Sequence, residues 1–190
     1  MTLPEPKELL MTTLRQPRAA AREILDLHVA PQIMWLLLAF IAVVGGFVHG
    51  VTLVILPAPE EVPMVFGSPL LFSVFLAIVA AVSAYALTFV GKGFGGRASF
   101  EDVLSLVIWL QIVNVVVQVV TLLLMVVSVS LSSGVSVVAS LWAIWLMVHF
   151  FEEAQQFGSL FKSFLVVILA SFAAAFGATL LSLLLGALFH

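Results

Sequence analysis

Three amide side chains stand out in a stretch of sequence that is otherwise almost entirely apolar. Gln111, Asn114 and Gln118 recur at i, i+3 and i+7, a spacing that places all three on one face of a helix. Intramembrane amides either hydrogen-bond a neighbouring helix or line a polar pathway or ligand site. His49 is expected at a similar depth in an earlier apolar helix, within hydrogen-bonding reach of Gln118. These four residues form the candidate intramembrane polar site.

A second group of polar residues, His149, Glu152 and Glu153, stands at i, i+3 and i+4, so that His149 can meet either carboxylate. Three such side chains could bind a metal. A dinuclear carboxylate site, however, requires Glu-x-x-His elements on two helices. Here only one such element is present, and its order is reversed. We therefore expect an ion pair at a helix end, or a contact with Lys162, and no metal.

The sequence contains no recognisable catalytic apparatus. Residues 91–96 (GKGFGG) match the dinucleotide-binding pattern G-x-G-x-x-G, but they follow an apolar helix and lie in no βαβ unit, so a flexible cytoplasmic turn is expected. The absence of cysteine excludes thiol catalysis and thiolate metal sites. We expect a protein that is not an enzyme and has no cofactor.

The composition places these residues in a lipid bilayer. Of the 190 residues, 63% are hydrophobic and 9% are charged, against about 45–50% and about 25% in soluble domains. The formal net charge of −3 argues against a nucleic-acid partner.

The charged residues divide the chain into long uncharged stretches, and a spanning helix needs about 20 residues. The stretches cover residues 27–59, 62–91, 103–151 and 163–190. The third is long enough for two helices, which we divide at Ser132-Ser133-Gly134, where small residues favour a turn. Ser99, followed by two acids, has the form of a helix start. The apolar runs do not alternate, which excludes a membrane barrel.

The predicted fold is therefore an all-α integral membrane protein with five transmembrane helices. A short cytoplasmic N-terminal segment, residues 1–31, precedes the transmembrane domain, residues 32–190. The expected spans are 32–56, 69–91, 103–131, 134–152 and 162–188.

All seven lysines and arginines fall on one side of these spans. They are Lys7, Arg15, Arg18, Arg22, Lys92, Arg97 and Lys162. By the positive-inside rule, this side is cytoplasmic, and the C-terminus is periplasmic or extracellular. The first span begins after a charged segment and should be retained as an anchor.

The N-terminal segment has an amphipathic pattern. Arg15, Arg18 and Arg22 recur at i, i+3 and i+7 and would share one helix face. They either contact anionic lipid head groups or serve only as topology determinants. Lys92 and Arg97, in the next cytoplasmic loop, are further candidate head-group contacts.

Small residues at four-residue spacing mark helix-packing seams. They are Gly46 and Gly50 in the first span, and Ala170, Ala174, Ala178, Ser182 and Gly186 in the fifth. Such stripes serve packing within the chain or a subunit interface equally well, so a homo-oligomer stays open.

Two segments resemble the short bacterial branch of the Ypt-interacting protein (YIP) family. They are residues 14–22 (LRQPRAAAR), before the first span, and 93–104 (GFGGRASFEDVL), leading into the third. The resemblance implies a five-helix membrane domain. In eukaryotic relatives it implies a role in vesicle traffic through Rab GTPases that contact a longer N-terminal region. It supplies no reaction and no catalytic residue.

These observations lead to two functional hypotheses. The first is a non-enzymatic multipass protein of a bacterial inner membrane, which organises the bilayer or acts as an adaptor for protein partners at the cytoplasmic face. The alternative is a small channel or transporter whose polar pathway is lined by His49, Gln111, Asn114 and Gln118.

Overall fold

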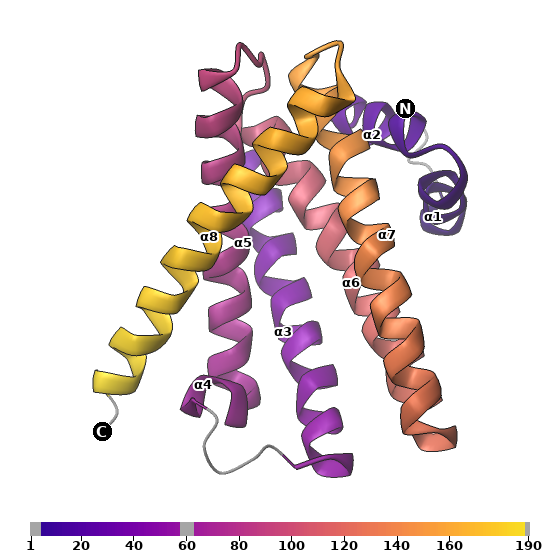
Figure 1. Cartoon of the computed structure of the whole chain (residues 1–190), viewed down its shortest axis with the longest axis vertical. Coiled ribbons are helices and arrows are strands. Elements are labelled where there is room, and N and C mark those ends of the chain that lie inside the picture. Colours follow the sequence, from indigo (N-terminus) through magenta and orange to yellow (C-terminus); the bar gives the residue numbers. More distant parts are fainter. Residues whose placement is uncertain (1–4, 58–62, 189–190) are drawn as a thin grey trace.

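The computed structural model describes residues 5–57 and 63–188, in which every regular element is a helix (Figure 1). The five long helices are α3 (Pro31–Ile55), α5 (Pro69–Gly93), α6 (Phe100–Val127), α7 (Val129–Gln155) and α8 (Leu160–Leu188). The three short ones are α1 (Pro6–Arg15), α2 (Pro17–Asp26) and α4 (Met64–Gly67). Five helices among the described residues are long and apolar enough to cross a membrane. The predicted all-α multipass membrane fold is therefore confirmed.

Several helices begin where their sequence satisfies the free N–H groups of the first turn. Proline opens α1, α2, α3 and α5, at a position where its missing N–H costs nothing. Ser99 and Asp102 form a reciprocal capping box before α6. The Asp102 N–H donates to the Ser99 hydroxyl (3.1 Å), and the Ser99 N–H donates to the Asp102 carboxylate (2.9 Å). This pair fixes the start of α6, as its sequence predicts.

The turn between α6 and α7 lies at Ser128, so the turn predicted at 132–134 is wrong. Ser128 ends α6 and caps α7, its hydroxyl accepting a bond from the N–H of Leu131 (3.3 Å). The later serines are satisfied within the helix pair. Ser132 donates to the carbonyl of Thr121 in α6 (2.8 Å), and Ser133 donates to a carbonyl four residues earlier (2.9 Å). Small polar residues with such bonds do not break a membrane helix.

The long helices pack around α5 and α6. Helix α5 contacts α3, α6 and α8, while α6 also contacts α3 and α7. Helices α7 and α8 meet at one end of the molecule and diverge toward the other (Figure 1).

The predicted packing seams serve contacts within the chain. A Cβ atom on Gly46 would lie 2.7 Å from the carbonyl oxygen of Pro69 in α5, and one on Gly50 would lie 2.8 Å from the Pro69 ring. Ala170 and Ala174 of α8 are buried. The side chains at positions 182 and 186 lie outside those that the structure describes. Close approach of α3 to α5 therefore explains the first seam without a second subunit.

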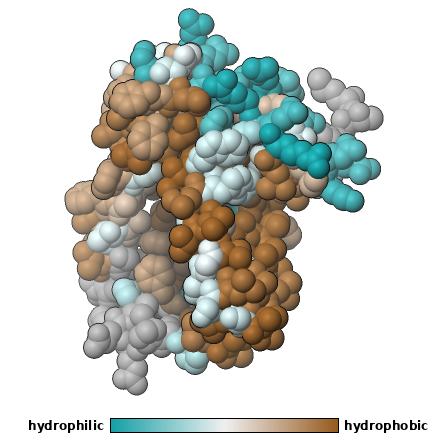
Figure 2. Space-filling model, turned by 45° about the vertical axis from the view of Figure 1, so that its right-hand side comes forward, coloured by the Kyte–Doolittle hydropathy of each residue, from teal (hydrophilic) through white to brown (hydrophobic). Residues whose placement is uncertain are grey.

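Charge gathers at one end of the bundle, which we call the basic end. It holds α2, the α5–α6 connection and the α7–α8 connection, and carries Arg18, Arg22, Lys92, Arg97 and Lys162. Figure 2 shows hydrophilic residues gathered there above a broad hydrophobic surface. Along the long helices, large apolar side chains such as Leu36, Phe47 and Phe172 are about 70% exposed, as expected for contact with lipid.

Candidate functional site

The N-terminal helices are folded onto the basic end of the bundle. Helix α2 packs against α6 and α7, with Ala20 and Ala21 fully buried and Ile24 nearly so. The chain bends at Gln16, because Pro17 disfavours a helical conformation in the residue before it. Arg15 therefore belongs to α1, whereas Arg18 and Arg22 belong to α2. The predicted continuous face of three arginines is wrong.

Two ion pairs join α2 to the end of α7. Arg18 Nη2 lies 2.9 Å from Glu152 Oε2. The Arg22 guanidinium donates two bonds to Glu153, from Nε to Oε1 (2.6 Å) and from Nη2 to Oε2 (3.1 Å). The hydrogen bond and the negative charge of Glu153 raise the pKa of Arg22 above its ordinary value. Arg22 therefore keeps its positive charge across the physiological range.

His149 does not join these carboxylates, so the predicted contact within His149, Glu152 and Glu153 is wrong. Its ring Nδ1–H donates to the carbonyl of Trp145, one turn earlier, at 2.8 Å. The carboxylates turn instead toward the arginines of α2. Lys162 makes no ion pair with any residue that the structure describes. Across the same residues, no three His, Asp or Glu side chains come close enough to share a metal ion.

A buried hydrogen bond fixes α1 as well. The indole N–H of Trp109 in α6 donates to the hydroxyl of Thr13 (3.0 Å), which in turn donates to the carbonyl of Leu9 (2.8 Å). Thr13 and Leu9 are both buried. Since a buried indole N–H without a partner is costly, this contact holds α1 against the bundle.

The glycine-rich segment after α5 is a fixed helix end. The Gly96 N–H donates to the Gly91 carbonyl (2.9 Å), and the Gly95 N–H donates to that of Lys92 (3.0 Å). Gly95 has φ +85°, the left-handed conformation that closes a Schellman motif. The predicted turn is present, and these bonds define its conformation. Its flexibility stays a prediction.

Gln155 packs against the glycines of this turn, and the sequence analysis missed it. Its side chain is fully buried, accepts a bond from the Ala98 N–H (3.2 Å) and donates to the Leu87 carbonyl (3.4 Å). A Cβ atom on either Gly91 or Gly96 would overlap the Gln155 amide. The glycine spacing that resembles a dinucleotide motif therefore makes room for a glutamine from α7.

His49 lies apart from the predicted polar site. Its Nε2–H donates to the carbonyl of Phe66 in α4 (2.8 Å), and its ring stacks on Phe72 at 3.9 Å between centroids. The predicted hydrogen bond to Gln118 is wrong. His49 instead ties α3 to the segment that precedes α5, away from the basic end.

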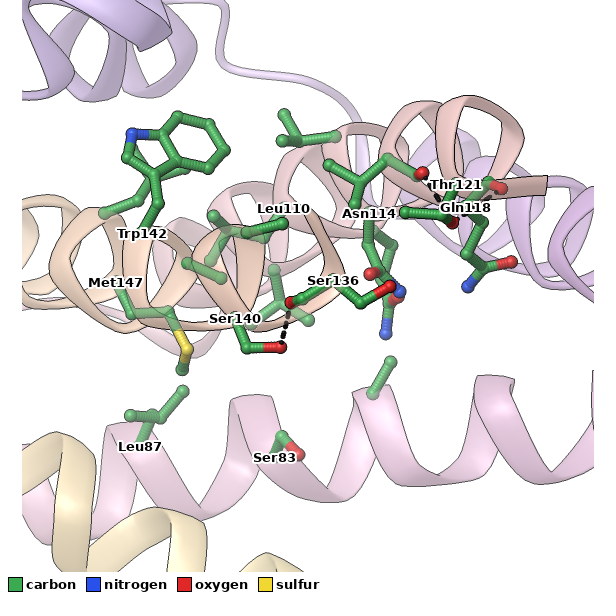
Figure 3. A pocket seen from close by; sticks show the side chains of 18 residues that line it. Ser83, Leu87, Leu110, Asn114, Gln118, Thr121, Ser136, Ser140, Trp142 and Met147 are labelled. Atoms are coloured by element: carbon green, nitrogen blue, oxygen red, sulfur yellow. Dashed lines mark hydrogen bonds between the residues drawn. The ribbon is translucent and has the colours of Figure 1, made fainter. Parts of the chain in front are cut away.

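The three amides of α6 share one face, and this face lines a cavity where α5, α6 and α7 meet (Figure 3). The cavity has a volume of about 400 Å³, within the range of small-molecule sites. Gln111 and Gln118 are partly exposed, and Asn114 is exposed. Further polar lining comes from Ser83 of α5, Thr121 of α6, and Ser136 and Ser140 of α7.

The amides and the hydroxyls of this cavity differ in their hydrogen bonding. Ser136 and Ser140 donate to carbonyls of their own helix (2.9 and 2.8 Å), and Thr121 donates to the Val117 carbonyl (3.0 Å). Within the part of the chain that the structure describes, the side chains of Gln111, Asn114 and Gln118 have no hydrogen-bond partner. The cavity therefore presents free donors and acceptors from the amides of α6 and from the Ser83 hydroxyl of α5.

The remaining candidate head-group contacts, Arg15, Lys92 and Arg97, are exposed near the basic end. The backbone N–H of Arg97 donates to the Gln155 carbonyl (3.2 Å), a contact that does not use its guanidinium. Their contact with lipid stays a prediction.

Together, the five spans and the docked N-terminal helices define a multipass helical membrane protein. A family model described as the Yip1 domain matches residues 11–183, which is most of the chain. The chain therefore belongs to the Yip1 family, as the two sequence segments predict. No curated protein and no solved structure matches it.

Proposed function

We propose that this chain is a non-enzymatic, membrane-organising adaptor of a bacterial inner membrane, with its basic end in the cytoplasm. The supporting observation is the fixed attachment of α1 and α2 to α6 and α7 through two ion pairs and the Trp109–Thr13 bond. We call the outer surface of α1 and α2, residues 6–26, the N-terminal platform. The orientation follows from the gathering of cations at this end.

The N-terminal platform has the character of a recognition surface. It exposes Lys7 and Arg15 beside Met11 and Leu14, which are 42% and 54% exposed. A surface that is already folded loses less conformational freedom on binding than a loose tail. Glu8 and Asp26 are exposed on it as well, so the platform offers a preordered, partly apolar surface of mixed charge to proteins at the cytoplasmic face.

The test is site-specific photo-crosslinking of the full chain in native membranes. A photoreactive amino acid at Met11 or Arg15 should give discrete protein adducts. The same group at Phe172, an exposed lipid-facing position on α8, is the matched control and should give lipid adducts only. A Thr13→Val substitution, which loosens α1, should weaken the platform adducts. Identical adducts from all three positions, or lipid adducts alone, would contradict the proposal.

A second candidate function is passage of a small uncharged solute, and the cavity lined by three amides favours it. Its pathway would use Gln111, Asn114 and Gln118 without His49, which lies elsewhere. Glycerol flux into proteoliposomes, compared between the wild type and Asn114→Leu, tests this function. Absent flux, or flux that the substitution leaves unchanged, would reject it.

A further inference from the structure

The cavity between α5, α6 and α7 is polar at one end and apolar at the other. Figure 3 shows Asn114, Gln118 and Thr121 toward one end, while Trp142, Met147 and Leu87 lie toward the other. On α6 the three amides, at positions 111, 114 and 118, lie in the middle third of the helix. A molecule that fits this cavity therefore needs a polar group at one end and an apolar body.

The amides require a partner that the described part of the chain does not provide. A polar group withdrawn from water without a hydrogen bond is unfavourable by about 1–3 kcal/mol, and by more in a hydrocarbon environment. Thr121, Ser136 and Ser140 have already used their hydroxyl protons on backbone carbonyls. Among the described residues, the free groups are thus the amide N–H donors and amide oxygens of α6 and the Ser83 hydroxyl of α5, and their partner must both accept and donate.

The cavity also restricts the charge of its occupant. No lysine, arginine, aspartate, glutamate or histidine lines it. The ion pairs that the described residues form lie at the basic end, on α2 and the end of α7. An ion placed beside Asn114 would lose its hydration without gaining a countercharge. The occupant is therefore uncharged.

We propose that this cavity binds an uncharged lipid alcohol, with its hydroxyl on Asn114 and Gln118 and its chain along Trp142 and Met147. A hydroxyl both donates and accepts, which matches the amides, and an acyl or alkyl chain matches the apolar end. The volume of about 400 Å³ accommodates the hydroxyl end and part of a chain. The site is independent of the N-terminal platform, so it holds whether or not the platform binds proteins.

The experiment uses the full chain in phospholipid vesicles with a monoacylglycerol that carries a diazirine in its chain. After illumination, adducts should map mainly to the part of α7 that contains Trp142 and Met147, along which the chain lies. Unlabelled monoolein should compete for labelling. Oleate, which is charged, and a hydrocarbon of the same length, which has no hydroxyl, should compete at least tenfold less well, as about one lost hydrogen bond implies.

Variants of the amides separate specific binding from general lipid contact. Asn114→Leu and Gln118→Leu should each reduce competed labelling about tenfold. Asn114→Gln, which keeps an amide, should retain most of it. Ser133→Ala is the matched control, because Ser133 lies on α7 outside the cavity and bonds only its own helix. Neither leucine variant removes a hydrogen bond from the described fold, so both should stay folded.

Three results would overturn the proposal. One is equal labelling of all the lipid-facing helices. Another is equal competition by the hydrocarbon, which is measured on the wild type and so does not depend on any variant folding. The third is disulfide crosslinking of two copies through Asn114→Cys, which would show a second chain in the cavity.

Discussion

The basic end and the α5–α6–α7 cavity use polar residues in opposite ways. At the basic end, the buried Gln155 and Thr13 both have hydrogen-bond partners, and Glu152 has an ion-pair partner. In the cavity, the side chains of Gln111, Asn114 and Gln118 have none among the described residues. Partnered polar groups hold a fold together, whereas unpartnered ones are available to something outside the chain. The contrast predicts a structural role for these buried contacts of the basic end and a binding role for the cavity amides.

The largest effect should come from filling the space around Gln155. Gly96→Ala places a methyl group on the Gln155 amide and 2.9 Å from the Gly91 carbonyl oxygen, both of which are fixed by their own bonds. We expect unfolding in detergent to become easier by about 3 kcal/mol. Thermal unfolding measures the change. Gly93→Ala is the control, since nothing lies within 4 Å of its added Cβ atom. If the two variants were equally stable, the close packing around Gln155 would not contribute to stability, and the contrast between the two regions would be contradicted.

A smaller loss is expected when α1 loses its buried bond. Thr13→Val keeps the shape of the side chain but leaves the Trp109 indole N–H without its acceptor. The expected cost is about 2 kcal/mol, with faster hydrogen exchange confined mainly to α1. Thr12→Val, at the neighbouring position whose hydroxyl bonds only the Glu8 carbonyl, should change neither measurement. Similar exchange in both variants would show that the bond does not hold the helix.

The ion pairs at the basic end should contribute less than the buried bonds. Arg18 is 46% exposed in its pair with Glu152, so solvent screens the attraction. Arg18→Gln should lower the free energy of unfolding by less than about 1 kcal/mol. Raising the salt concentration should remove most of the difference from the wild type. If the loss were as large as that of Thr13→Val and insensitive to salt, the ion pairs would contribute as much to the stability of the basic end as its buried hydrogen bonds.

The smallest effect should come from the cavity itself. Asn114→Leu removes an amide that bonds nothing in the described chain, so the free energy of unfolding should not fall by more than about 0.5 kcal/mol. Gln155→Leu, the same change at a partnered amide, should be clearly destabilising. Comparable losses in the two variants would show that both amides are structural and would remove the distinction between the regions.

The features that sequence predicts well here are local. Uncharged stretches predict the five spans, and Ser99 with Asp102 predicts the start of α6, because hydropathy and capping depend on neighbouring residues. The prediction of a turn at 132–134 is wrong for a related reason. A serine hydroxyl can bond a helix carbonyl as readily as it can favour a turn, and Ser128 alone is enough to join two helices.

The features that sequence predicts poorly depend on partners far along the chain. Glu153 meets Arg22 across 131 positions, so the pattern of His149 and the two glutamates gave the wrong partner. Gln155, near the end of a membrane helix, resembles an ordinary solvated residue. The one sequence signal for its role is the glycine spacing at 91–96. That signal can be interpreted only when the ends of α5 and α7 are known to lie together. The amide face of α6 is visible from periodicity, but its cavity requires α5 and α7 in place.

The single-residue junction at Ser128 also bears on how the protein is made. Helices α6 and α7 follow each other with no polar loop between them. During synthesis there is consequently no hydrophilic tether to thread through the bilayer behind α6. We therefore expect the two helices to enter lipid together as a hairpin, which the Ser132–Thr121 bond closes. Because α3 and α5 already anchor the chain, the test follows α6 itself: in chains arrested at successive positions after Ser128, crosslinks from α6 to lipid should appear only when α7 has emerged as well.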